Sequence, residues 1–318
     1  MRIGVPAENR PLEKRVILHP SELRDIARRH EVLVEEGAGV GVGILDAEYR
    51  AAGCQVARRE KVYAADLVVR IKEPREDEIR LMKRGAILMS MMHLRCAPLL
   101  ESALVRQKIV AVPLENIKDA LDRRIVEAVQ DTGRIGMEYA FKLWGRDPAT
   151  ATVKIMGYGN VAQGAIRAAV EKLASVEILN RRHYAEMEKH IPGTDILVDA
   201  VNRPYRRDVA KEPPFVTFEM LKLFKPMSVL VDLVANPEHH APIESMKPTY
   251  MNEPYYMFEG LYHTALWGWP AMDPVNVSKR YSLQVAPLVR SVADRGLEHA
   301  ALPVRKAFIR LDRGERVA

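Results

Sequence analysis

Residues 153–166, VKIMGYGNVAQGAI, decide the fold, because they read as an apolar strand, a glycine-rich turn and the start of a helix. Gly157 allows a tight turn out of the strand, and Gly159 lets the backbone approach a phosphate group closely. The helix that begins near Asn160 directs free N–H groups and the positive end of its dipole at the same point. A second strand follows at 176–179. This order predicts a dinucleotide-binding Rossmann unit, and the alternative is an ordinary tight turn.

The small residues of the predicted helix have two expected roles. Ala162 and Gly164 are expected to permit close packing of the helix on the strand. Contacts with the cofactor are predicted for the turn and the helix start, at Gly157, Gly159, Asn160, Val161 and Ala162.

The residues after the second strand bear on the choice of nucleotide. NAD-specific sites usually place Asp or Glu there for the ribose 2′-hydroxyl, but this chain has Asn180, Arg181 and Arg182. Two guanidinium groups can hold a 2′-phosphate, and no carboxylate is present to repel it. The alternative is a solvated basic turn. We favour NADP(H) over NAD(H).

Strand-like and helix-like apolar patterns alternate along most of the 318 residues, which predicts an α/β protein of two domains. A helix over 21–29 with a serine N-cap, a long amphipathic helix over 125–144 and a helix over 274–293 are expected. We assign residues 1–130 with 282–318 to a discontinuous substrate and catalytic domain. Residues 131–281 are assigned to the NAD(P)-binding Rossmann domain.

The composition limits the classes of protein to consider. Hydrophobic residues make up 48% and charged residues 28%, as in soluble globular proteins. The net charge of +6 comes from scattered residues without a long basic block, so nucleic-acid binding is not favoured. No apolar run has the ~20 residues of a membrane helix. The chain is expected in the cytoplasm, with Cys54 and Cys96 as buried thiols and with no metal site.

Three basic residues lie next to predicted elements of the first domain: Arg15, Lys72 and His93. Lys72 and His93 follow strands, and ligands of parallel α/β sheets bind at the carboxyl ends of the strands. Each residue taken alone is ambiguous, since a single Arg or Lys is usually surface charge and a single His is usually structural.

Six motifs of the first domain follow one another in an order that indicates a family resemblance. They are GVPAENR at 4–10, KRVILHP at 14–20, HEVLVEEGAGVG at 30–41, DAEYRAAG at 46–53, IKEP at 71–74 and MMHL at 91–94. With the later glycine turn, this order resembles the alanine dehydrogenase and transhydrogenase alpha-subunit family. The turn at 157–165 looks similar to one opine-type branch, the N5-(carboxyethyl)ornithine synthases. The resemblance implies two Rossmann-like, doubly wound domains flanking a cleft, and a homo-oligomer is expected.

The resemblance also implies roles for individual residues. Arg15 would bind the carboxylate of a 2-oxo acid, and Lys72 would hold that carboxylate or the carbonyl oxygen. His93 would act as general acid and base. Thr132 falls where the family places a serine hydroxyl near the cofactor phosphate.

Some positions depart from the family pattern. Ser90 stands where alanine dehydrogenases have a tyrosine, and Asn236 replaces the second aspartate of the loop after the late strand, whereas Asp232 is retained. Asn236 can hydrogen-bond substrate but cannot take a proton, which puts simple alanine deamination in doubt. In the nearby loop, Trp267 is expected to pack in the core, and a tryptophan beside the substrate would favour a bulky amine.

The sequence thus predicts hydride transfer from a nicotinamide to an imine formed between a pyruvate-like 2-oxo acid and an amine, with an amino acid as the favoured amine. An ammonia-using alanine or lysine dehydrogenase and a saccharopine dehydrogenase-like enzyme are alternatives. Outside this class, the chain could be a non-catalytic nucleotide-binding sensor or an isolated transhydrogenase subunit.

Overall fold

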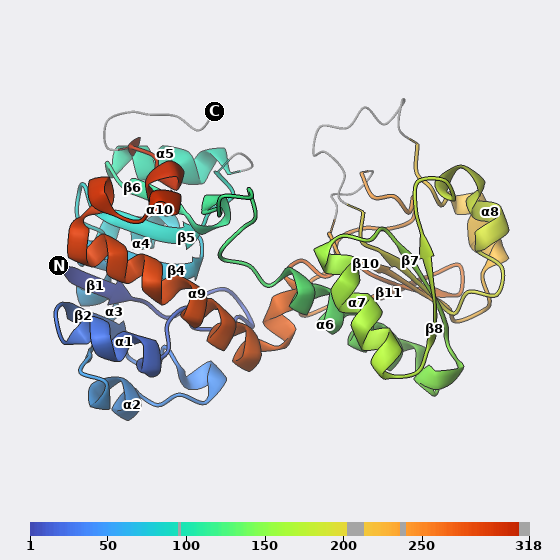
Figure 1. Cartoon of the computed structure of the whole chain (residues 1–318), viewed down its shortest axis with the longest axis horizontal. Coiled ribbons are helices and arrows are strands. Elements are labelled where there is room, and N and C mark those ends of the chain that lie inside the picture. Colours follow the sequence, from blue (N-terminus) through green and yellow to red (C-terminus); the bar gives the residue numbers. More distant parts are fainter. Residues whose placement is uncertain (95–96, 202–212, 236–239, 312–318) are drawn as a thin grey trace. The chain divides into compact units, whose positions relative to one another are not determined.

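The structure is a computed structural model that describes residues 1–94, 97–201, 213–235 and 240–311. The chain divides into two compact units (Figure 1). Unit 1 consists of Met1–Glu127 and Asp273–Ala318, and unit 2 of Ala128–Met272. The predicted return to the first domain at 282 lies too late, because that position falls inside one continuous helix, α9 (Pro274–Arg295), which belongs to unit 1 from its first residue.

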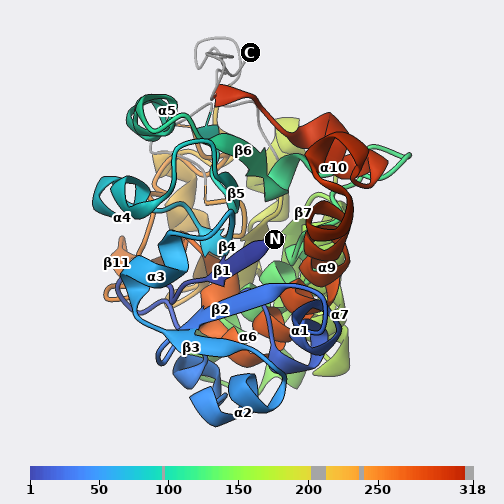
Figure 2. The same cartoon turned by 90° about the vertical axis from the view of Figure 1, so that its left-hand side faces the viewer.

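Unit 1 is built on a six-stranded parallel sheet with the order β3-β2-β1-β4-β5-β6 (Figure 2). Its strands are β1 (Arg2–Val5), β2 (Glu31–Glu35), β3 (Gln55–Ala57), β4 (Leu67–Lys72), β5 (Ile87–Met91) and β6 (Val110–Pro113). The strand order reverses direction at β1, so helices cover both faces, as in doubly wound folds. Leu67, Val68, Val69 and Ile71 are completely buried, as expected for a central strand of such a sheet.

Two groups of helices cover this sheet. The first comprises α3 (Arg59–Tyr63), α4 (Glu76–Leu81) and α5 (Pro98–Arg106), and the second α1 (Pro20–Ala27) and α9 on the opposite face, with α2 (Asp46–Ala51) and α10 (Leu302–Ala307) at the periphery (Figure 2). A Cβ at Gly4 would lie 2.1 Å from the carbonyl oxygen of Val62, so β1 and α3 pack backbone against backbone. The predicted serine cap is wrong: α1 begins at Pro20 after His19, and the Ser21 hydroxyl donates to Glu22.

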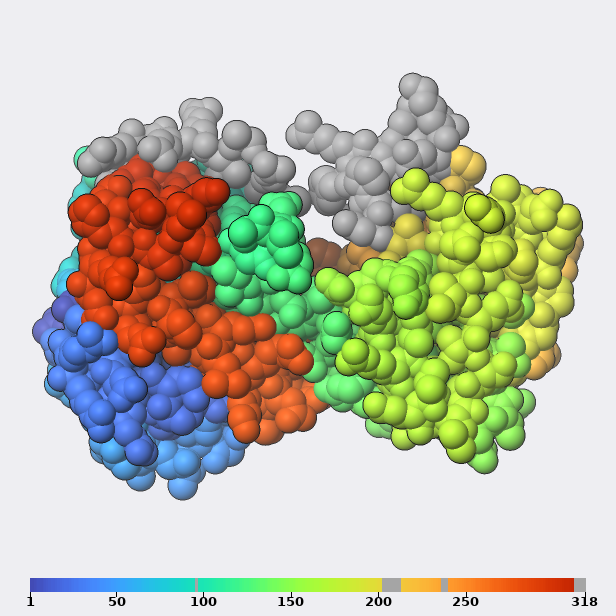
Figure 3. All heavy atoms as spheres, viewed as in Figure 1, coloured from blue at the N-terminus to red at the C-terminus, as the bar shows by residue number. Residues whose placement is uncertain are grey.

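The C-terminal segment completes unit 1. The hydroxyl oxygens of Ser278 and Ser282 on α9 accept hydrogen bonds from the backbone N–H groups of Val16 and His19. Ile309 exchanges two backbone hydrogen bonds with Ala111 of β6. Figure 3 shows the orange and red C-terminal residues spread beside the blue N-terminal residues on the surface of this unit.

Unit 2 contains a second six-stranded sheet with the order β11-β12-β10-β9-β7-β8. Its strands are β7 (Thr152–Met156), β8 (Ser175–Leu179), β9 (Ile196–Asp199), β10 (Val229–Asp232), β11 (Tyr256–Phe258) and β12 (Leu261–Thr264). Among these described strands, only β11 runs antiparallel to its neighbour. Its helices are α6 (Val129–Trp144), α7 (Asn160–Glu171) and the short α8 (Met187–His190). The two sheets confirm the predicted α/β fold with two Rossmann-like units.

Helices α6 and α7 cross at glycines. A Cβ at Gly133 would lie 1.9 Å from the carbonyl oxygen of Val161, and one at Gly164 would lie 2.0 Å from that of Gln130. The expectation that Gly164 serves helix–strand packing is therefore wrong, because its close neighbour is the backbone of α6. The predicted start of this helix at 125 is also wrong, since α6 begins at Val129.

Among the described helices, none combines the length and the apolar composition needed to cross a bilayer.

Candidate active site

The carboxyl ends of adjacent strands bring two of the predicted residues together in unit 1. Lys72 is the last residue of β4, and its partner in the register is Met91, the last residue of β5. His93 follows two residues later. Parallel strands place their carboxyl ends at one edge of the sheet, so this edge carries both side chains.

A buried charge network holds the end of β4. Arg70 is completely buried, and its Nη2 donates to Oε2 of Glu8 at 3.2 Å, while its Nη1 donates to Glu78 at 3.1 Å. The carboxylate of Glu8 also accepts the N–H groups of Ile71 at 2.6 Å and Lys72 at 3.2 Å. A carboxylate that accepts two backbone donors and one guanidinium is strongly oriented. Glu8 therefore positions the backbone from which Lys72 extends.

The ammonium of Lys72 has a strongly lowered pKa. Burial, followed by repulsion from Arg15, lowers the pKa of its ammonium to about 8, whereas Glu13 opposes the shift. Within the described part of the chain, its Nζ makes no hydrogen bond or ion pair. A partly buried ammonium without a counter-ion is suited to receive an anionic substrate group.

Arg15 is held by an acidic neighbour that the sequence analysis did not single out. Its Nε donates to Oε1 of Glu13 at 2.7 Å, and its Nη2 donates to Oε2 of the same carboxylate. Both side chains are almost fully buried, and the guanidinium lies 5.8 Å from the centre of the Tyr281 ring. Because one edge of the guanidinium is occupied, a bidentate substrate carboxylate would have to use the other edge, formed by the two Nη atoms.

The backbone of His93 is held in an unusual conformation. Its φ is +46°, in the left-handed region, and Glu115 accepts the N–H groups of Met92 at 3.2 Å and His93 at 2.6 Å. The imidazole Nδ1 lies 3.9 Å from Oε1 of Glu115. Such backbone strain persists only where surrounding contacts enforce it, and it recurs at functional sites.

The electrostatics of His93 connect it to the other predicted residues. Partial desolvation lowers its pKa although 56% of the side chain is exposed, the negative charge of Glu115 raises it, and the charges of Lys72 and Arg124 lower it further. Lys72 is thus within electrostatic range of both Arg15 and His93. The structure brings these three predicted residues together in unit 1.

The glycine turn of unit 2 has the geometry of a phosphate-binding loop. Gly157 has a φ of +98°, and a Cβ there would lie 3.1 Å from the carbonyl oxygen of Ala200. A Cβ at Gly159 would meet nothing within 4 Å, so this side of the turn is open. Gly159 is also the N-cap of α7 and offers no side-chain cap. The first N–H groups of α7, at Asn160, Val161 and Ala162, are therefore available to an anion.

The turn after β8 is stabilised by hydrogen bonds from its backbone N–H groups to its own side chains. Oδ1 of Asn180 accepts the N–H of Arg182 at 3.0 Å, and Nδ1 of His183 accepts the N–H of Asn180 at 2.9 Å. Arg181 and Arg182 are exposed, and neither forms an ion pair with a carboxylate of the described residues. Both guanidinium groups remain available for a phosphate.

Two neighbouring strands of unit 2 each end in an aspartate. Asp199 ends β9, Asp232 ends β10, and the two are register partners and fully buried. Oδ1 of Asp232 accepts the N–H groups of Val234 and Ala235, so this residue shapes the loop that leads to position 236. The predicted substrate residue Asn236 lies outside the described residues.

Burial and the nearby charge of Asp232 raise the pKa of Asp199 well above its usual range. One oxygen of Asp199 accepts the N–H of Val201 at 2.9 Å, and the other is buried without a hydrogen-bond partner in the structure as described. No motif in the sequence singles out Asp199.

The two hydroxyl groups named from the sequence and the two tryptophans differ in their surroundings. The hydroxyl of Thr132 donates to the carbonyl oxygen of Ala128 within α6, and the hydroxyl of Ser90 donates to that of Lys72 at 2.8 Å. The expected core position of Trp267 is wrong, because its exposed fraction is 51%. Trp269 is the buried tryptophan, and its Nε1 donates to the carbonyl oxygen of Asp232.

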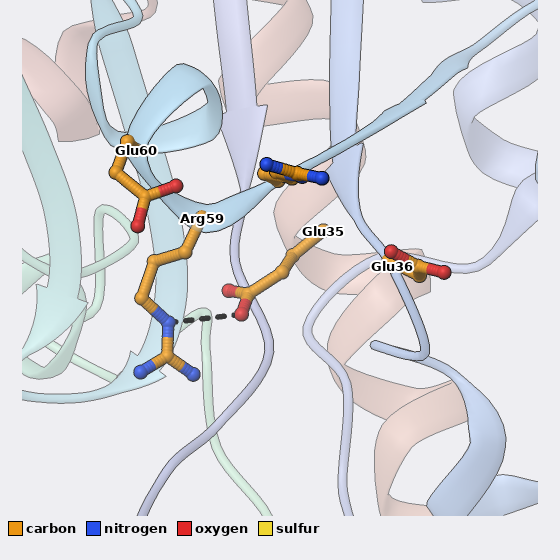
Figure 4. A pocket seen from close by; sticks show the side chains of 5 residues that line it. Glu35, Glu36, Arg59 and Glu60 are labelled. Carbon is orange, nitrogen blue, oxygen red and sulfur yellow. Dashed lines mark hydrogen bonds and ion pairs between the residues drawn. The ribbon is translucent and has the colours of Figure 1, made fainter.

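A surface pocket of unit 1 lies beside the carboxyl ends of β2 and β3, farther along the same edge of the sheet (Figure 4). It is lined by Glu35, Glu36, Arg58, Arg59 and Glu60. The carboxylate of Glu35 accepts the N–H of Ala7 and pairs with Arg59 at 2.9 Å, so its oxygens are already engaged. In a dinucleotide site, an acid at this strand end would bind ribose, and the first turn would be glycine-rich. Here that turn contains Pro6 and Ala7, which indicates that unit 1 does not bind the dinucleotide in this way.

The acidic partners of these cations in unit 1 were not predicted. Glu8, Glu13 and Glu115 hold the predicted cations or their backbone, but acidic residues near strand ends are too common to single out. Of these three, only Glu115 could have been predicted from the sequence, because it follows the apolar strand β6 as His93 follows β5.

Comparisons with known proteins agree with this architecture. Residues 4–134 match the model of the N-terminal domain of the alanine dehydrogenase/PNT family, and residues 181–309 match that of its C-terminal domain. An alanine dehydrogenase of Methanococcus maripaludis is 30% identical over 95% of this chain and 90% of its own length. One of Bacillus subtilis is 28% identical over 95% and 90%.

Solved structures give the same result. An L-alanine dehydrogenase superposes with a TM-score of 0.88 at 26% identity, over 98% of this chain and 96% of the other. A transhydrogenase from Sinorhizobium meliloti shares the fold, with a TM-score of 0.83 at 21% identity over 97% and 96%. The family and the class of enzyme predicted from the sequence are confirmed: the chain belongs to the alanine dehydrogenase/PNT family and is an NAD(P)-dependent oxidoreductase that acts on CH–NH or CH–NH2 donors.

Proposed function

We propose that the enzyme interconverts a 2-oxo acid and the corresponding amino acid, with ammonia as the nitrogen source. The observation that carries this proposal is the ammonium of Lys72, which lacks a counter-ion in the described structure and is electrostatically coupled to Arg15 and His93. The relatives reported above are alanine dehydrogenases, which supports ammonia as the amine over the opine-type chemistry favoured from the sequence.

In this proposal, three residues of unit 1 have separate roles. Lys72 binds the carboxylate or the carbonyl oxygen of the 2-oxo acid, and Arg15 contributes its free edge to the carboxylate. His93 exchanges a proton with the substrate oxygen or nitrogen through Nε2, the ring nitrogen that does not face Glu115. Its lowered pKa keeps the imidazole neutral at pH 7, so it is ready to accept a proton in the direction of deamination.

Unit 2 would hold the nicotinamide cofactor, which supplies or accepts the hydride when bound. The open side of Gly159 and the uncapped start of α7 fit a pyrophosphate, held by the N–H groups of Asn160, Val161 and Ala162. Thr132 lies on α6 next to Gly133, whose backbone packs on Val161, and this proximity supports a contact with the phosphate.

We infer a preference for NADP(H), supported by the two exposed guanidinium groups of Arg181 and Arg182 and by the absence of an acid at position 180. Replacing both arginines by alanine removes two charge-assisted contacts to the 2′-phosphate. The dissociation constant for NADPH should rise about 10- to 100-fold, because each such contact is worth about a factor of ten. The constant for NADH should change little. Equal losses for both nucleotides would rule out the 2′-phosphate contact.

An amino acid as the nitrogen donor is the second candidate. It is favoured by Asn236, which cannot take a proton where the family has an acid, and by the exposed Trp267, which offers an apolar surface on unit 2. This reaction would yield a carboxyalkyl amino acid.

One assay separates the two candidates. Oxidation of NADPH and NADH is followed with pyruvate, and ammonia is compared with a panel of amino acids. Turnover with ammonia alone supports the proposed function, and turnover only with an amino acid supports the second candidate. His93→Ala and Lys72→Ala should lose reductive activity and still bind cofactor. Full activity in both variants would show that this cluster is not catalytic.

A further inference from the structure

A short hairpin follows Glu115 and extends the site around His93. Residues 117–125 fold back on themselves, because the N–H of Ile125 donates to the carbonyl oxygen of Ile117 at 2.9 Å. The N–H of Asp119 donates to the carbonyl oxygen of Arg123 at 2.9 Å. Since Glu115 binds the backbone of His93, the hairpin is anchored two residues from that contact.

Almost all charges of this hairpin are satisfied within it. Nζ of Lys118 lies 2.9 Å from both carboxylate oxygens of Asp122. Arg123 pairs with Asp119 at 2.7 Å. Arg124 differs from its neighbours: its side chain is exposed, and no carboxylate of the described residues pairs with it.

The position of Arg124 relates it to His93. Its backbone pairs with that of Lys118, three residues after Glu115, which holds the backbone of His93. From this position its charge acts on the imidazole, as the charge of Lys72 does. Arg10 also acts on this imidazole, but it is paired with Glu73.

The other cations of the site that the structure describes already have partners. Arg15 is paired with Glu13, and Arg70 is paired with Glu8 and Glu78. Lys72 and Arg124 therefore remain as two cations that act on His93 without a counter-ion in the described structure. A 2-oxo monocarboxylate such as pyruvate brings only one carboxylate and can neutralise only one of them.

We propose that Arg124 binds a second carboxylate of the substrates, in addition to the carboxylate of the 2-oxo acid that Lys72 and Arg15 receive. This inference rests on the proposed function of that site. The second carboxylate can come from a 2-oxo dicarboxylic acid aminated with ammonia, or from an amino acid that donates the nitrogen. Both sources present the same chemistry to a guanidinium, namely a planar anion that accepts two parallel hydrogen bonds.

Arg123 provides a matched control. It is the adjacent residue of the same hairpin and the same type, it is exposed, and it is engaged by Asp119. Arg124→Gln and Arg123→Gln therefore remove the same charge from neighbouring positions.

Three reactions are compared with the full-length enzyme and NADPH: pyruvate with ammonia, 2-oxoglutarate with ammonia, and pyruvate with each of several amino acids. The measured quantity is the ratio of kcat/KM for each reaction with a second carboxylate to kcat/KM for pyruvate with ammonia. In Arg124→Gln this ratio should fall about 10- to 100-fold, through a higher KM, for the reaction that supplies the second carboxylate. In Arg123→Gln it should stay within about twofold, as for an exposed surface change. The reaction whose ratio falls identifies the source.

Unchanged ratios in Arg124→Gln, or equal changes in both variants, would overturn the proposal. If the wild-type enzyme turns over none of these mixtures, the proposed function fails separately. Equilibrium binding then decides the role of Arg124. With NADP+ present, 2-oxoglutarate should bind more tightly than pyruvate, and Arg124→Gln should remove that difference; a difference that survives the substitution would refute the role.

Discussion

The ammonium of Lys72 shows how one residue can give the site its pH dependence. Burial and the charge of Arg15 place its pKa near 8, so the ammonium is fully present at pH 6 and is lost as the pH rises through 8. The dissociation constant for pyruvate, measured by calorimetry with NADP+ and without ammonia, should therefore rise up to about tenfold per pH unit above 8.

Lys72→Arg supplies the control for this titration. A guanidinium keeps its charge throughout the range, so the dissociation constant of the variant should not rise between pH 8 and 10. If the variant weakens over the same pH range as the wild type, another group is responsible for the titration.

Asp199 predicts a stabilising substitution. Its pKa is raised in the folded protein, so the unfolded chain gains free energy by ionising above about pH 4, while the folded carboxyl stays neutral. Stability is therefore lost between pH 4 and the folded pKa. Asp199→Asn keeps the acceptor for the N–H of Val201 and removes this penalty. Its free energy of unfolding at pH 7.5 should exceed that of the wild type by about 1 kcal/mol or more, with a smaller gain at pH 4.5.

Thermal unfolding at the two pH values measures this difference. Asp195→Asn is the contrasting variant, because Asp195 is paired with Lys225 at 2.9 Å and its loss should destabilise the protein. An equal gain from Asp199→Asn at both pH values would show that ionisation is not the cause.

At the scale of elements, the crossing of α6 and α7 fixes the start of the phosphate-binding helix. Gly133→Ala would place a Cβ 1.9 Å from the carbonyl oxygen of Val161, and backbone cannot rotate away as a side chain can. We expect a loss of stability of about 2–3 kcal/mol and at least tenfold weaker dinucleotide binding, because the helices must separate. Lys142→Ala, at an exposed position of α6, should change neither quantity in unfolding and binding assays. A fully stable Gly133→Ala with unchanged binding would contradict this account.

Short sequence patterns correctly predicted those helices and strands that are stabilised by contacts between residues close together in the sequence. The strand and helix around Gly157 were foreseen because a glycine-rich turn follows an apolar run. Only the last residue of the hairpin at 117–125 falls within the helix predicted over 125–144, and the backbone pairing of Ile117 with Ile125 leaves no local signal in the sequence. The β11–β12 hairpin was not predicted either, although its two-residue turn contains Gly260; in the structure, Glu259 and Gly260 both have positive φ, as such a tight turn requires.

In the candidate site too, the sequence indicated residues by their position after a strand but did not indicate their ion-pair partners. Lys72 and His93 follow apolar strands, and this placement indicated them. Glu13 and Arg124 could not be predicted, because whether a charge is paired depends on contacts that the order of residues does not show.

At the scale of the molecule, unit 2 is one continuous stretch of chain and unit 1 is not. Fragment 128–272 contains a complete sheet and its covering helices, so it should fold alone and bind NADPH. Fragment 1–127 lacks α9 and Ile309, which bond to its backbone, and it should not fold cooperatively. Circular dichroism during heating and titration with NADPH test both fragments. An unfolded 128–272 or a cooperative 1–127 would contradict the division.

The two backbone hydrogen bonds between Ala111 and Ile309 also have a consequence for biosynthesis. Domains usually fold in the order in which they leave the ribosome. Here the half that is translated first cannot close until the last helices have emerged, whereas the middle of the chain can fold earlier. During translation, the apolar face that α9 later covers stays exposed, and it is there that a nascent chain would most need a chaperone.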